Sequence, residues 1–78
     1  MDDITGDWLS ADGRMRVRLG PDGTFDELRT DSGRRFHGIW RSDDGLHVHF
    51  RDPATGYEAI GELRDGVLYA DGVAFRKA

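Results

Sequence analysis

The sequence predicts an all-β domain, a small up-and-down antiparallel barrel of about eight short strands. Three observations lead to this prediction. Turn signals recur along the whole chain, the segments between them alternate apolar and polar residues, and no segment has the 3.6-residue period of a helix. Seventy-eight residues are enough for one domain, so residues 1–78 are expected to form a single barrel.

Seven turn signals punctuate the chain, and most of them end in Gly after Asp or Ser. Gly accepts the positive φ of tight hairpin turns, and Asp supports such turns with side-chain hydrogen bonds. The signals lie at Ala11–Gly13, Pro21–Gly23, Asp31–Gly33, Asp43–Gly45, Pro53–Gly56, Asp65–Gly66 and Asp71–Gly72. They separate strands expected at Gly6–Ser10, Arg14–Leu19, Thr24–Thr30, Arg35–Arg41, Leu46–Arg51, Tyr57–Arg64, Val67–Ala70 and Val73–Arg76.

Alternation within these strands identifies the face that is buried. In the segment Arg14–Leu19, three arginines lie on one side and three apolar residues on the other. Two-residue loops at the last two Asp-Gly turns bring together a second apolar set through the pairs Leu63–Leu68, Leu68–Phe75 and Ala70–Val73. An open sheet would expose this face and two edges, so we expect the sheet to close into a barrel.

The register at Pro21–Gly23 decides what lies inside the barrel. A three-residue loop pairs Phe25 with Leu19 and buries both, whereas a two-residue loop turns Phe25 to solvent. We favour the first, which also places Glu27 and Arg29 on the inner wall. A charge there needs a partner or a ligand, so the two residues either pair, reach water at the rim, or contact a bound molecule.

These inward positions, together with aromatic residues on the expected inner wall, form the candidate ligand-binding set. Its members are Phe25, Glu27, Arg29, Phe36, Trp40 and Tyr57. Gly38 alternates with two of these rings, and it leaves either a binding niche or room for a neighbouring ring.

No catalytic or metal centre is expected. The chain has no cysteine, hence no disulfide, thiolate nucleophile or Cys-based metal site. Ser10, Ser32 and Ser42 lie at turns or strand ends without a paired base, and no cofactor is expected.

The three histidines could share one outer face, but their spacing does not define a zinc geometry. A three-residue turn at Asp43–Gly45 sets His49 opposite Ile39 and His37 opposite Arg51, and a cationic neighbour disfavours a metal there. We therefore expect no metal site.

Charge and hydropathy limit the partners. The formal net charge is -4 and the pI is near 5.2, and the expected register sets Asp26 opposite Arg18 in the arginine row. Nucleic acid is therefore not an expected partner. The chain has neither a signal-peptide pattern nor a long apolar run, so we expect a cytoplasmic protein without membrane contact, as a monomer or homodimer.

Several motifs resemble one family of small hypothetical proteins, typified by a protein from Agrobacterium tumefaciens. The matching segments are GDW at residues 6–8, DGRMRVRL at 12–19, PDGTFDELR at 21–29, FHGIW at 36–40, TGY at 55–57 and GELRDGVLYADGVAFR at 61–76. The resemblance covers nearly the whole chain. It implies a streptavidin-like barrel and a ligand-binding role, with no known ligand or reaction.

Trp8 and Arg76 also resemble the closing device of lipocalin-like barrels, in which a cation covers an indole at the barrel floor. We expect this contact to tie the first strand to the last.

The favoured function is capture of a small-molecule ligand in the barrel mouth, between aromatic residues and the Glu27–Arg29 pair. One alternative is a small pocket enzyme of cyclase or isomerase type, in which Glu27 or a histidine moves a proton. The other is a filled barrel that acts as a dimerisation scaffold.

Overall fold

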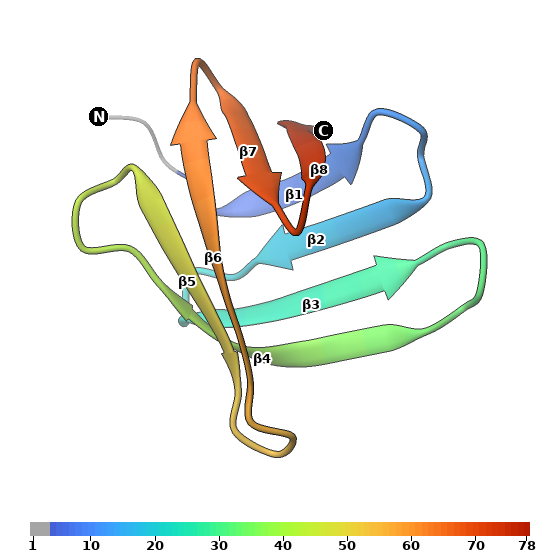
Figure 1. The fold of residues 1–78 in the computed structure, drawn as a ribbon, viewed down its shortest axis with the longest axis horizontal. Coiled ribbons are helices and arrows are strands. Elements are labelled where there is room, and N and C mark those ends of the chain that lie inside the picture. The colour runs from blue at the N-terminus through green and yellow to red at the C-terminus, as the bar shows by residue number, and fades with distance from the viewer. Residues whose placement is uncertain (1–3) are drawn as a thin grey trace.

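The structure, a computed structural model, describes residues 4–78 and contains eight strands, as the sequence predicts. They are β1 (Gly6–Ser10), β2 (Met15–Leu19), β3 (Thr24–Arg29), β4 (Arg35–Arg41), β5 (His47–Asp52), β6 (Tyr57–Arg64), β7 (Val67–Ala70) and β8 (Val73–Lys77). Each strand pairs antiparallel with the next, and β8 returns beside β1, so the barrel is closed (Figure 1). Residues 4–78 include no helix of the length and apolarity needed to cross a membrane.

The tight turns have the geometry that their residues predict. Asp65 and Gly66 have φ values of 52° and 78°, and Asp71 and Gly72 have values of 52° and 73°, so both residues of each turn are left-handed. This is the type I′ arrangement that matches the twist of paired strands. It produces the predicted pairs Leu63–Leu68, Leu68–Phe75 and Ala70–Val73.

The turn at residues 21–23 is the predicted three-residue loop. Gly23 has a φ of 86°, and the Gly20 amide donates to the Thr24 carbonyl at 2.8 Å. The register therefore sets Leu19 opposite Phe25, with Glu27 and Arg29 on the inner side of β3.

The register predicted for the β4–β5 hairpin is wrong by two residues. His49 lies opposite Arg41, and Arg51 lies opposite Ile39. The loop is longer than a tight turn because Asp44 Oδ1 accepts hydrogen bonds from the amides of Leu46 and His47, each at 2.8 Å. Because the shift is an even number of residues, the inner and outer faces of β5 are unchanged.

One half of the barrel is filled by side chains. Trp8, Leu19 and Val48 are buried there, and Trp40 joins them while its Nε1 donates to the Gly20 carbonyl at 2.9 Å. Burial of such side chains contributes about 1.5 to 3 kcal/mol each. Open space can therefore lie only at the opposite end of the barrel, where the turns at residues 11–14, 30–34, 53–56 and 71–72 connect the strands.

The cation over the Trp8 indole is Lys77, not the predicted Arg76. Lys77 Nζ lies 5.9 Å from the ring centroid, and Trp8 pairs with Lys77 across the β1–β8 junction. Arg76 pairs with Leu9 on the outer face, because successive residues of a strand point to opposite sides.

Candidate functional site

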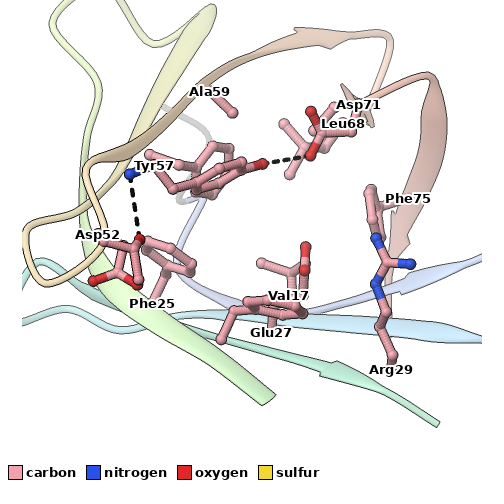
Figure 2. Close-up of a pocket in the computed structure, with 14 residues that line it drawn as sticks. Val17, Phe25, Glu27, Arg29, Asp52, Tyr57, Ala59, Leu68, Asp71 and Phe75 are labelled. Atoms are coloured by element: carbon pink, nitrogen blue, oxygen red, sulfur yellow. Dashed lines mark hydrogen bonds between the residues drawn. The ribbon is translucent and has the colours of Figure 1, made fainter. Parts of the chain in front are cut away.

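A cavity of about 480 Å³ occupies the other half of the barrel (Figure 2). Four phenylalanines line it: Phe25, Phe36, Phe50 and Phe75. Four smaller apolar residues complete its walls: Val17, Ala59, Leu68 and Ala70. The Phe25 and Phe50 rings meet edge to face, with centroids 5.3 Å apart, so the contact between these two rings is fixed by packing.

Polar groups also line the cavity, and they come from several strands and two turns. They are Glu27, Arg29, Asp52, Thr55, Tyr57 and Asp71. Three of the six carry carboxylates and one carries a guanidinium, so the polar part of the lining has a formal charge of -2.

Glu27 is a charged residue on the inner side of β3, and apolar side chains of the cavity wall surround it. Its carboxylate is half-buried and points into the cavity (Figure 2), and no hydrogen bond or ion pair within 4 Å joins it to another residue among 4–78. Burial raises the pKa of Glu27; the charge of Arg29 partly offsets this and the charge of Asp71 adds to it. Of the alternatives that the sequence left open, a direct Glu27–Arg29 ion pair is therefore absent from the described residues, and only a long-range attraction joins the two side chains.

Arg29 is exposed at the edge of the cavity. Its guanidinium carbon lies 5.9 Å from the centroid of the Phe36 ring, a cation–π contact. The Arg29 charge is thus held against an aromatic face rather than against a carboxylate.

Tyr57 and Asp71 form a hydrogen bond across the mouth of the cavity. The Tyr57 hydroxyl donates to Asp71 Oδ2 at 2.6 Å and joins the start of β6 to the β7–β8 turn (Figure 2). Burial and the Asp71 carboxylate raise the pKa of Tyr57 to about 12. The phenol therefore stays a neutral donor at physiological pH.

Five of the six residues that the sequence singles out line this cavity: Phe25, Glu27, Arg29, Phe36 and Tyr57. Trp40, the sixth, points inward but belongs to the filled half. Gly38 is not a niche, because a Cβ there would meet the Arg51 carbonyl and lie 2.8 Å from Phe25 Cε1. The space beside Gly38 is used by a neighbouring ring.

Sequence reasoning missed Phe50, Asp52, Asp71 and Phe75 as cavity residues. Phe50 and Phe75 carry the alternation signal of inward positions, and Asp52 shares the parity of Phe50. Asp71 has no such signal, because a turn residue has no strand parity. Only its pairing with Tyr57 in space reveals it.

The histidines lie on the outer face, away from this cavity. His47 Nδ1 is 2.7 Å from Asp44 Oδ2, a contact within the β4–β5 loop. In the part of the chain that the structure describes, no three His, Cys, Asp or Glu side chains come close enough together to hold a metal ion.

Comparison with known proteins identifies the family. The profile described as Agrobacterium tumefaciens protein Atu4866 matches residues 2–77. The chain belongs to the Atu4866 family. The solution structure of the protein Atu4866 from Agrobacterium tumefaciens is similar to this one, with a TM-score of 0.77 and 32% sequence identity over 97% of this chain and 95% of that chain. A search of curated proteins gave no significant match.

The family membership and the barrel predicted from the Atu4866-like motifs are thus confirmed. A streptavidin-like form of the barrel and a ligand-binding role stay predictions.

Proposed function

We propose that this protein binds a small, largely apolar molecule in the cavity between Phe25, Phe36, Phe50 and Phe75. The observation that carries the proposal is the cavity itself, about 480 Å³ of space in a barrel whose other half is filled. Ligand pockets generally measure about 300 to 1,000 Å³ and combine apolar walls with a few polar groups. This cavity has both features.

The cavity is built on strands that are paired on both sides, which favours binding without rearrangement. A preformed site avoids the cost of ordering side chains when the ligand enters. Apolar surface removed from water contributes about 25 cal/mol per Å², so the aromatic walls supply most of the expected affinity. The Tyr57–Asp71 hydrogen bond supplies a polar contact at the mouth, and Glu27 supplies one on the inner wall.

A fluorescence titration with the uncharged dye N-phenyl-1-naphthylamine tests the proposal, because its emission rises in apolar surroundings. We expect saturable binding of one dye per chain. Ala70→Phe fills the cavity and should abolish the rise. Ala74→Phe is the matched control, since Ala74 is on the outer face of the same β7–β8 hairpin, opposite Tyr69. Absence of saturable binding, or equal binding by the Ala70→Phe protein, would overturn the proposal.

A second candidate function is proton transfer by Glu27. It is favoured by one observation: a half-buried carboxylate with a raised pKa and no partner within the described chain, facing an apolar cavity. The test is deuterium exchange in D₂O at the acidic C–H of an aromatic ketone that the cavity binds. Faster exchange with the wild-type protein than with Glu27→Gln supports this function, and equal rates exclude it.

A further inference from the structure

We propose that the ligand of the cavity is an organic cation: an aromatic or aliphatic body that carries a protonated amine. This inference deepens the proposed function and rests on it. It starts from the composition of the cavity lining, which combines four phenylalanine rings with three carboxylates and a single guanidinium.

The aromatic lining favours a cation over a neutral ligand. The face of a phenyl ring is negative, and an ammonium group within about 6 Å of its centroid is attracted to it. Arg29 shows that this lining can hold a cation, because its guanidinium already lies 5.9 Å from the Phe36 centroid. Phe25, Phe50 and Phe75 present further rings to the interior.

The carboxylates add to this preference. Asp71 already accepts the Tyr57 hydroxyl, and Asp52 Oδ1 accepts the Ala54 amide at 2.9 Å, but neither hydrogen bond supplies a positive charge to the carboxylate. Glu27 has no partner among residues 4–78, and it is set deeper among the apolar side chains. A half-buried carboxylate without a partner is costly, and a protonated amine would supply up to three donors to it.

An anionic ligand fits the same space poorly. Among residues 4–78, Arg29 is the one cationic side chain that lines the cavity, whereas three carboxylates line it. A bound carboxylate or phosphate would be repelled by Glu27 and Asp71, whose charges already act on each other. Juxtaposed like charges suppress binding of the wrong partner.

Three compounds that differ only in their polar end test the inference: 2-(2-naphthyl)ethylamine, 2-(2-naphthyl)ethanol and 2-naphthylacetate. Each is titrated against bound N-phenyl-1-naphthylamine at pH 7 and low salt. We expect the amine to displace the dye at a concentration about tenfold lower than the alcohol, which corresponds to about 1.4 kcal/mol. The carboxylate should be the weakest of the three.

Glu27→Gln should reduce the ratio between amine and alcohol affinities towards one. Glu58→Gln is the matched control, because Glu58 is exposed on the outer face of β6 opposite Arg51, and the same change in net charge there should leave the ratio unchanged. The dye titration of each variant reports whether its cavity has formed.

The outcomes separate this inference from the proposed function. If the alcohol displaces the dye as well as the amine does, the cavity binds apolar molecules and the inference of a cationic ligand is wrong. An equal loss of the amine preference in both Glu→Gln proteins would also overturn it, because net charge would then explain the effect. If the dye itself does not bind, the proposed function fails first.

Discussion

At the scale of single residues, Glu27 is a half-buried carboxylate on an otherwise largely apolar part of the inner wall. Its inward position follows from the three-residue loop before β3, which fixes the parity of the whole strand. Removal from water raises its pKa, the charge of Arg29 partly offsets this rise and the charge of Asp71 adds to it, and neither residue forms an ion pair or hydrogen bond with Glu27. The protonation state of one carboxyl group is thereby linked to the stability of the barrel.

The first prediction concerns this linkage. Because the folded-state pKa of Glu27 lies above its ordinary value of 4.5, its contribution to stability is present below about pH 4.5 and is lost as the pH rises through the folded-state pKa. Gln cannot ionise, so the melting temperature of Glu27→Gln relative to wild type should increase over that interval and then level off. Thermal melts followed by circular dichroism between about pH 4 and pH 8 measure this. A difference that is constant across the range contradicts it.

The second prediction concerns the Asp44–His47 contact in the β4–β5 loop. The carboxylate raises the pKa of His47 above its ordinary value of 6.5, and the imidazole and two backbone amides lower the pKa of Asp44. The His47 contribution to stability is therefore complete below pH 6.5 and lost as the pH rises through its folded-state pKa. The Asp44 contribution is present above its ordinary pKa of 3.8 and is lost in stronger acid.

Asp44→Asn should lower the His47 pKa towards 6.5, as measured by NMR titration of the imidazole C–H signals. The Asn side chain keeps an oxygen for the amides of Leu46 and His47, so the loop is expected to persist. Asp43→Asn is the control, because it removes the same charge from the same loop but leaves the contact in place. If both variants lower the His47 pKa equally, the cause is general charge rather than the hydrogen bond.

At the scale of the strands and turns, the parts that were predictable from sequence are those decided by local chemistry. The two-residue Asp-Gly turns specify their own type. The burial of Phe25 opposite Leu19 selects the three-residue loop, and this loop fixes the register of β3. The register of the β4–β5 hairpin was not predictable from a count of turn residues, because Asp44 accepts the amides of Leu46 and His47 and the partner of Arg41 is His49, two residues beyond the expected position. Trp40 shows a second limit: parity tells that a side chain points inward, but not which end of the barrel it fills.

Gly38 provides the prediction at this scale. A Cβ at this position of β4 would meet the Arg51 carbonyl and the Phe25 ring, so Gly38→Ala should destabilise the fold by about 1 to 3 kcal/mol through overpacking. Gly45→Ala is the control for backbone conformation, since Gly45 has a φ of 73° but nothing within 4 Å of its added Cβ. Urea denaturation measures both. A loss at Gly38 no larger than the loss at Gly45 contradicts the packing argument.

At the scale of the whole molecule, closure depends on the junction between β1 and β8, the pair farthest apart in sequence. It consists of three residue pairs from Trp8–Lys77 to Ser10–Phe75, and the Ala78 amide extends it by donating to the Asp7 carbonyl at 2.9 Å. The side chains differ on the two faces. Phe75 and Ser10 are buried inside, whereas Arg76 and Leu9 face outward. The cation that covers the Trp8 indole must therefore come from position 77.

The last prediction compares the contributions of Lys77 and Arg76 to the stability of the barrel. Lys77→Met keeps an unbranched side chain over the Trp8 ring but removes its charge, so it should lower the free energy of unfolding by about 0.5 to 1 kcal/mol. For a domain of this size that corresponds to a fall of roughly 2 to 8 °C in melting temperature. Arg76→Met removes the same charge from the adjacent position on the outer face and should cost less. An equal or larger loss for Arg76→Met would show that net charge, rather than the contact between Lys77 and Trp8, supports the closure of the barrel.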